Sequence, residues 1–279
     1  MNAAERWGAA LRSWAIPDEI LSRAPESPWQ FPPELFRSRA DAAAATKEHG
    51  PTVLQALAAL PDGGTILDVG VGAGAASRHL WPRASRVTGV DSSEAMLEEF
   101  RQVAEAANVE AVPVLGRWPD AAAEVDAADV VVCAHVLYNV QDLEPFARAL
   151  HDHAHHRVVI EITSTHPLAW MSDLWLRFHG LERPTEPTAD DAEQALRGSG
   201  FEINREDVER PPRTGGFEQR EDAIGLIRRR LCLTPDRDDE IAEALGDRLA
   251  QRDGLWSAGP EAQRLATLWW NTSAPTLCS

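Results

Sequence analysis

The chain has 279 residues, with 27 basic and 44 acidic side chains and a formal net charge of −17. This excess of negative charge would repel a phosphate backbone and argues against nucleic acid as a partner. Cys133, Cys232 and Cys278 are scattered without a CxxC pair, which argues against a disulfide framework or structural zinc site. No signal-peptide pattern and no apolar run of roughly 18 residues is present, so we expect a cytoplasmic protein without a membrane anchor.

The first 60 residues predict a helical cap. Trp7, Leu11 and Trp14 recur at helical spacing, and helical patterns resume over residues 40–60. The intervening stretch 25–36 is rich in proline and aromatic residues, which suits a lid. We therefore expect a cap at 1–60 and a single larger domain at 61–279.

From residue 65 the pattern alternates between short apolar strands and helices. The predicted strands are 65–69, 86–91, 111–115, 128–134 and 156–162, and the predicted helices are 74–81, 93–107 and 142–153. Buried strands that alternate with helices predict a parallel sheet with helices on both faces, which is a doubly wound α/β fold.

This rhythm breaks after the fifth strand. Residues 163–188, rich in tryptophan and proline, and the charged residues 216–250 are expected to be lid insertions. A helix at 189–198 and strands at 201–208 and 264–271 complete the predicted domain.

A glycine-rich turn follows the first strand. Gly70, Gly72 and Gly74 come directly after the strand, and Asp91 ends the second strand about 20 residues later. The same letters fit a dinucleotide fingerprint, so an NAD(P)-dependent oxidoreductase is the alternative. However, the carboxylate of Asp68 would be unfavourable beside a pyrophosphate and favourable beside an ammonium or sulfonium group. Tyr138, the single tyrosine, also lacks a lysine four residues on.

The stretches ILDVGVGAGAASRHL and VTGVDSSEAML resemble the class I S-adenosylmethionine-dependent methyltransferases, in their small-molecule branch. The resemblance covers about residues 60–210. It implies a Rossmann-like, mostly parallel seven-stranded sheet with an antiparallel last strand. It also implies S-adenosylmethionine as methyl donor, with S-adenosylhomocysteine as product.

The resemblance assigns cofactor-binding roles to residues after the first four strands. Gly70 and Gly72 would let the backbone approach the methionine part, and Asp91 would accept hydrogen bonds from both ribose hydroxyls. Trp118 follows Arg117 where the family usually has an acidic residue, so we expect its ring to cover the adenine. The assigned residues are Asp68, Gly70, Gly72, Gly74, Asp91, Ser92, Met96, Arg117, Trp118, Ala134 and His135.

Methylation of a hydroxyl would also need a base. The candidates follow the fourth and fifth strands, where ligands bind in open α/β sheets. His166 is the first choice and His135 the second, with Glu161 and Tyr138 as further candidates. Glu161 with His166 could hold a divalent ion, so dependence on a metal stays open, but we assign no metal site.

The run HDHAHH at 151–156 is a second possible metal-binding segment. His151 and His155 are four residues apart, a spacing that can chelate a metal on a helix. Cationic imidazoles also suit a solvated helix C-terminus, which is the interpretation that we favour.

The tryptophans outside the cofactor core suggest an aromatic-walled acceptor pocket, and the acidic composition suits a neutral acceptor. We therefore expect a small-molecule hydroxyl, on a sugar or a polyketide-like product. A protein side chain as acceptor, a non-catalytic S-adenosylmethionine-binding protein and a homodimer are further possibilities.

Overall fold

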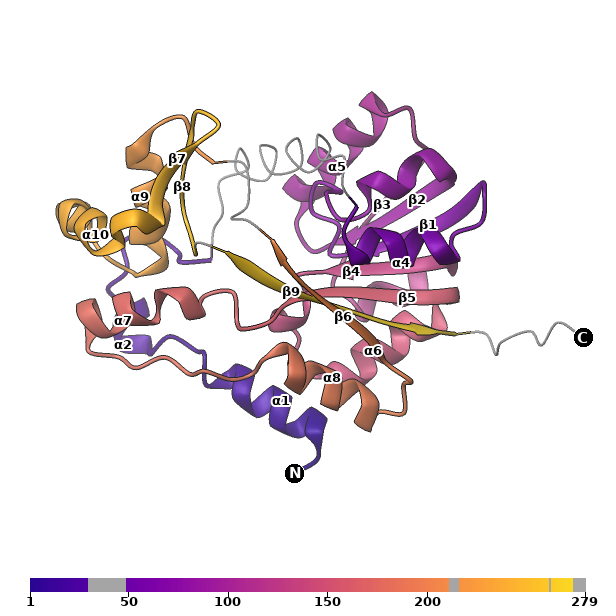
Figure 1. Cartoon of the computed structure of the whole chain (residues 1–279), viewed down its shortest axis with the longest axis horizontal. Coiled ribbons are helices and arrows are strands. Elements are labelled where there is room, and N and C mark those ends of the chain that lie inside the picture. Colours follow the sequence, from indigo (N-terminus) through magenta and orange to yellow (C-terminus); the bar gives the residue numbers. More distant parts are fainter. Residues whose placement is uncertain (30–48, 211–215, 261, 273–279) are drawn as a thin grey trace, which may run out of the picture.

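The computed structural model describes residues 1–29, 49–210, 216–260 and 262–272, and a seven-stranded sheet lies at its centre (Figure 1). The strand order is β3-β2-β1-β4-β5-β9-β6. The strands are β1 (Gly64–Val69), β2 (Ala84–Asp91), β3 (Ala111–Leu115), β4 (Ala128–Ala134), β5 (Ala154–Thr163), β6 (Asn204–Arg210) and β9 (Gln263–Asn271). The first five pair in parallel, whereas β9 runs antiparallel to both β5 and β6. The predicted doubly wound fold with one antiparallel strand is confirmed.

Helices cover both faces of the sheet. One face is covered by α1 (Ala3–Arg12), α6 (Leu143–Asp152) and α8 (Ala189–Gly198). The other is covered by α4 (Pro51–Ala59), α5 (Glu94–Ala106) and a 3-10 helix (Arg78–Arg83). Because side chains alternate along a strand, Leu67 belongs to the first core and its neighbour Ile66 to the second.

Short 3-10 helices link several elements, and they span Asp120–Glu124, Leu137–Asn139, Ala169–Met171, Pro235–Arg237 and Gly246–Arg248. Among the described helices, none combines the length and apolar character needed to cross a bilayer.

The α-helix predicted at 74–81 is wrong. Turns follow Gly74, and the chain then forms the 3-10 helix Arg78–Arg83. The connection to β2 is short, and Pro82 has no backbone N–H to donate within it. Trp81 also folds back, since its indole nitrogen donates to the Ser77 hydroxyl at 3.0 Å. The local geometry therefore favours the tighter helix.

The start of the predicted cap is built into the main domain. Trp7 and Leu11 of α1 share the core of α6 and α8, and the Trp7 indole nitrogen donates to the Val140 carbonyl at 2.7 Å. Most of the predicted lid at 25–36, and the predicted helix up to residue 48, lie outside the described residues. The boundary at residue 60 stays a prediction, but α1 does not lie over the site as a cap.

The two insertions form one lobe with a core of its own. The lobe contains α2 (Asp18–Leu21), α7 (Ser172–His179), α9 (Arg220–Arg230), α10 (Asp238–Leu245) and the hairpin of β7 (Leu249–Arg252) and β8 (Leu255–Ala258). Its core joins Ile16 to Leu174 of the first insertion and Ile227 of the second. Figure 1 shows the lobe beyond the edge where β9 begins, which is the edge where the parallel strands end. The insertions thus face the edge at which ligands bind in such sheets.

Candidate active site

The glycine turn lies against the segment that follows β4. Gly70 has a φ of +76°, which suits glycine, and a Cβ atom there would overlap the Val136 side chain. The first βα turn and the end of β4 therefore meet closely, as the predicted site requires.

Gly72 and Gly74 serve different purposes. Gly72 has a φ of +52°, and a Cβ atom there would meet nothing within 4 Å. Its backbone N–H donates to Asp91 at 3.0 Å, and the other Asp91 oxygen accepts from the Ser93 N–H at 2.9 Å. A Cβ atom at Gly74 would instead overlap the Trp81 ring. Gly72 thus borders open space beside Asp91, whereas Gly74 allows packing of the loop.

Asp68 is a fully buried carboxyl group beneath this turn. Neither of its oxygens makes a hydrogen bond of good geometry to a described residue. Burial raises its pKa to about 7, the facing Ser77 hydroxyl partly offsets this, and the charge of Asp91 adds to it. An unsatisfied carboxyl group of this kind would be stabilised by a nearby cation and destabilised by a pyrophosphate.

The end of β2 carries the other residues assigned to the cofactor. Ser92 is exposed, and the Met96 N–H lies 3.4 Å from the Ser93 hydroxyl at the start of α5. Leu115 pairs with Asp91 in the parallel register and is 57% exposed, so it adds an apolar surface at this edge. Sequence analysis missed Leu115, and its only signal was its place at the end of a predicted strand.

The expected role of Trp118 is wrong. Its ring is buried in the core, with the indole nitrogen 3.4 Å from the Phe146 carbonyl and the ring edge-on to His153 at 5.0 Å. His153 follows the C-terminus of α6, so the indole is directed away from the edge where the strands end. Packing of this large apolar ring against α6 explains its position. Arg117 is exposed beside it.

His135 and Glu161 meet where β4 and β5 end. The His135 backbone N–H donates to the Glu161 carbonyl at 2.8 Å, and its Nε2 lies 3.1 Å from Glu161 Oε1. The other carboxylate oxygen accepts from the Thr52 hydroxyl at 2.6 Å, and Thr267 lies 2.8 Å from that hydroxyl. Ala134 ends β4 next to this pair and opposite Glu161 in the register. Two residues named separately from the sequence thus form one dyad.

Glu161 is ionised at neutral pH although it is buried. Burial opposes its ionisation, but the hydrogen bond and charge of His135, the charge of Arg210 and the Thr52 hydroxyl outweigh burial and hold its pKa at about 2. An ionised carboxylate of this kind orients an imidazole ring and stabilises its protonated form.

His166 and Tyr138 form a second pair, packed in the core near α1. The His166 ring stacks on Trp14 with 3.7 Å between ring centroids, and its Nδ1 accepts from the Leu168 N–H at 3.3 Å. Burial, with the charge of Arg183, lowers the His166 pKa to about 4. Burial raises the pKa of Tyr138, whose hydroxyl donates to the Thr163 carbonyl at 2.8 Å. Within the described ranges, no hydrogen bond or ion pair joins this pair to Glu161.

The comparisons with known proteins show the family and the fold. A family model described as a methyltransferase domain matches residues 37–206. The chain belongs to this methyltransferase family. It is a class I enzyme whose cofactor is S-adenosylmethionine. No curated protein sequence matches the methyltransferase.

Solved structures show the same fold. One of these structures concerns the conversion of a disulfide bond into a thioacetal group during echinomycin biosynthesis. It matches with a TM-score of 0.53 at 17% identity, and the match covers 92% of this chain and 93% of that chain. The cyclopropane-fatty-acyl-phospholipid synthase-like protein of Lactobacillus casei matches with a TM-score of 0.51 at 17% identity, and the match covers 90% of this chain and 97% of that chain. YcgJ of Bacillus subtilis matches with a TM-score of 0.50 at 15% identity, and the match covers 80% of this chain and 98% of that chain.

The residues at the carboxyl edge fit this cofactor. The buried carboxyl of Asp68 suits a ligand that carries a sulfonium and an ammonium group and no phosphate. The open space at Gly72 leaves room beside Asp91, which would bind the ribose. Asp68, Gly72 and Asp91 would therefore hold the cofactor of the methyltransferase.

The histidine run at 151–156 does not form a chelating pair on a helix. α6 ends at Asp152, so His155 lies on β5. His151 Nδ1 accepts from the Trp270 indole at 3.1 Å, which places that ring against the core rather than at a fully solvated end. Across the described part of the chain, no group of three or more histidine, cysteine or acidic side chains is arranged to hold a metal ion.

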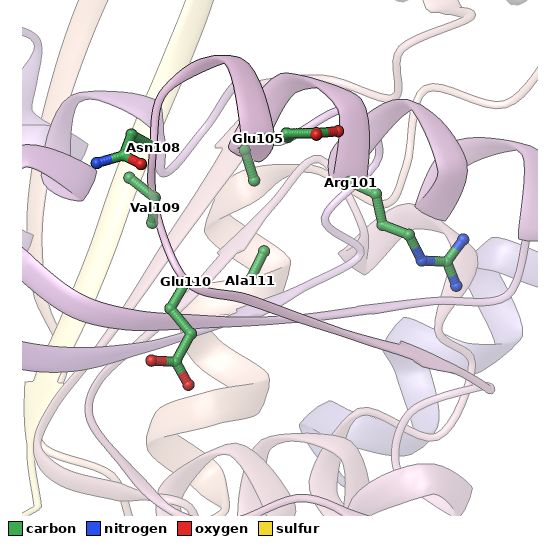
Figure 2. A pocket seen from close by; sticks show the side chains of 7 residues that line it. Arg101, Glu105, Asn108, Val109, Glu110 and Ala111 are labelled. Atoms are coloured by element: carbon green, nitrogen blue, oxygen red, sulfur yellow. The ribbon is translucent and has the colours of Figure 1, made fainter.

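A separate hollow of about 450 Å³ lies between the end of α5 and the start of β3. This is the amino edge of the sheet, opposite the site. Figure 2 shows the side chains of Arg101 and Glu110 pointing away from each other rather than toward a common centre. These two charged groups therefore do not converge on a common ligand position.

Proposed function

We propose that this methyltransferase methylates a hydroxyl oxygen of a small-molecule acceptor and that His135 removes the hydroxyl proton. The observation that carries the proposal is the 3.1 Å contact between His135 Nε2 and Glu161 Oε1. The pair lies at the ends of neighbouring strands, and His135 directly precedes Val136, which packs against the glycine turn.

The dyad supplies what a hydroxyl acceptor needs. S-adenosylmethionine provides an electrophilic methyl group on a sulfonium and leaves as S-adenosylhomocysteine. A hydroxyl must lose its proton as it is methylated, and an imidazole held at Nε2 by a carboxylate can take that proton at its other nitrogen. Glu161 then stabilises the imidazolium through its negative charge, so it acts as a positioning residue.

His135 suits this role better than His166. The His135 side chain is 32% exposed, whereas His166 is 9% exposed and stacked on Trp14. A base with a pKa of about 4 is poorly matched to proton removal at neutral pH. We therefore place His166 and Tyr138 in the supporting core rather than beside the acceptor.

The lobe supports a small acceptor, because it stands beyond the edge that carries the dyad (Figure 1). A sugar-like or polyketide-like hydroxyl compound is the class we propose. The tryptophans add less than the sequence suggests, since Trp7, Trp14 and Trp175 are all buried.

The test compares two histidines that each pair with a carboxylate. His135→Asn is the probe, because asparagine tolerates the positive φ of +60° at this position. His156→Asn is the matched control, because His156 contacts Asp129 at 3.3 Å at the opposite edge of the sheet. Methyl transfer to a panel of phenols and sugars is followed by mass spectrometry, which locates the added methylene.

We expect His135→Asn to lower kcat by about 100-fold or more while the affinity for S-adenosylhomocysteine stays unchanged. His156→Asn should stay within about twofold of the wild type. Full activity of His135→Asn, or products methylated only on carbon, would contradict the proposal. Cofactor binding without transfer to any acceptor would favour a non-catalytic role.

A further inference from the structure

Arg210 lies beside the proposed dyad and is not used by it. It is the last residue of β6, and its side chain reaches past β9 toward Glu161 on β5. Its Nη2 lies 3.6 Å from Glu161 Oε2, which is an ion-pair distance but too long for a hydrogen bond. The side chain is 38% exposed. A cation therefore faces partly into solvent at the edge where the acceptor is expected.

The described residues leave the N–H donors of this guanidinium without a hydrogen-bond acceptor. The two Glu161 oxygens already accept hydrogen bonds from His135 and Thr52. Within the described residues, Arg210 makes no side-chain hydrogen bond, although a guanidinium carries five N–H donors. Arg210 thus supplies charge to Glu161 and keeps its directional donors for another partner.

The chain keeps space for Arg210 at Gly50. A Cβ atom at Gly50 would overlap the guanidinium, yet the φ of Gly50 is −75° and its ψ is 171°, which any residue adopts. The backbone therefore does not require glycine here. A side chain at position 50 would push the flexible guanidinium aside, so Gly50 leaves room for Arg210 at the start of α4.

Basic side chains continue from this point along the edge. His49 precedes Gly50, and its ring meets that of His79 edge-on at 4.9 Å. The formal charge of −17 describes the whole chain, whereas this part of the site gathers a guanidinium and imidazole rings. An acceptor that contacts the Arg210 guanidinium would gain from a negative charge, whereas the composition of the chain predicts a neutral acceptor.

We propose that the acceptor is a hydroxylated carboxylic acid whose carboxylate binds Arg210. This rests on the proposed hydroxyl methylation and names the class of its substrate. A guanidinium binds a carboxylate through two parallel N–H donors, which fixes direction as well as charge. Because Glu161 contacts both Arg210 and His135, a small acceptor held by the guanidinium would keep its hydroxyl near the base.

The test measures binding without chemistry. Calorimetry on the full chain, saturated with S-adenosylhomocysteine, compares 4-hydroxybenzoate with 4-hydroxybenzamide and glucuronate with glucose. Arg210→Gln is the probe, and Arg264→Gln is the matched control, since Arg264 is an exposed arginine of the neighbouring strand that pairs with Glu209 at 2.9 Å. Affinity for S-adenosylhomocysteine itself is measured for all three proteins.

In the wild type and Arg264→Gln we expect at least one carboxylate to bind about tenfold or more tightly than its neutral counterpart. Arg210→Gln should lose that preference and keep its affinity for S-adenosylhomocysteine. Equal binding within each pair, no binding of either carboxylate, or an unchanged preference in Arg210→Gln would overturn the proposal. A loss of S-adenosylhomocysteine affinity in Arg210→Gln would also overturn it, because the guanidinium would then serve the cofactor.

The two proposals fail separately. A carboxylate preference that depends on Arg210, together with methylation of the phenols only on carbon, would keep the anion site and contradict hydroxyl methylation. Oxygen methylation that depends on His135, without a carboxylate preference, would keep hydroxyl methylation and contradict the anion site at Arg210.

Discussion

The sheet domain and the lobe differ in how their cores are built from the sequence. Leu67 and Phe100 of the sheet domain and Leu231 of the lobe are all completely or almost completely buried. The sheet core on the α4 and α5 face, however, comes from strands and helices that follow one another between residues 53 and 159, whereas the lobe core joins residues near Ile16 to both insertions. Periodicity predicts the first kind of core, and it cannot show that distant helices share the second.

The two cores are joined by a short path. Leu11 belongs to the core of the sheet domain and Ile16 to the core of the lobe. Between them Trp14 stacks on His166, and the Arg183 guanidinium lies 5.1 Å from the centre of the Trp14 ring. We infer that the sheet domain holds the cofactor and that the lobe encloses the acceptor, and the following experiments separate these roles.

The largest effect is expected from truncating one core residue in each region. Phe100→Ala removes a buried ring that packs beside Gly74 and Gly89, and Leu231→Ala removes a buried residue of the lobe. Each should lower the free energy of unfolding by about 3–5 kcal/mol, measured by urea unfolding. Only Phe100→Ala should also weaken binding of S-adenosylhomocysteine, because its ring supports the glycine turn. Loss of that binding in folded Leu231→Ala would show that the lobe is part of the cofactor site.

A second comparison uses two buried titratable groups, Asp68 beneath the glycine turn and His166 between the sheet domain and the lobe. The pKa of Asp68 is raised to about 7, so its contribution to stability is present below pH 4 and is lost as the pH rises through 7. The pKa of His166 is lowered to about 4, so its contribution is present above pH 6.5 and is lost as the pH falls through 4. The two contributions oppose each other between pH 4 and 6.5.

Replacing either group should leave the pH dependence of stability that the other group contributes. Over pH 4–6.5, the free energy of unfolding should rise by about 3 kcal/mol with pH in Asp68→Asn and fall by about 3 kcal/mol in His166→Phe. The phenylalanine keeps an aromatic ring against Trp14. Urea unfolding at several pH values measures both slopes. Slopes equal to that of the wild type would mean that burial does not shift these groups.

The smallest effect on stability is expected at two glycines with matched backbones. Gly72 and Gly63 have φ values of +52° and +72°, and a Cβ atom at either position would meet open space. Each alanine variant should therefore lose only about 1 kcal/mol of stability through backbone strain. Gly72→Ala should also lose at least about tenfold in S-adenosylhomocysteine affinity by calorimetry, whereas Gly63→Ala, at the other edge, should not. Equal affinities would place the cofactor away from Gly72.

Much of the fold and part of the site could be predicted from the sequence. The strands, Asp91 at the end of β2 and the glycines after β1 are set by local patterns, so their places were predictable. Arg210 and Thr52 meet Glu161 only through the order of β5, β9 and β6 and the packing of α4, which no local pattern encodes. Trp118 was misassigned because sequence position alone does not tell which side of a loop an indole takes.

The central claim is that the turn after β1 accepts a cationic methyl donor rather than a dinucleotide. The most direct measurement is calorimetric titration of the full chain with S-adenosylhomocysteine and with NADH. We predict binding of S-adenosylhomocysteine with one site per chain and no measurable binding of NADH. Tight binding of NADH without binding of S-adenosylhomocysteine would contradict the account.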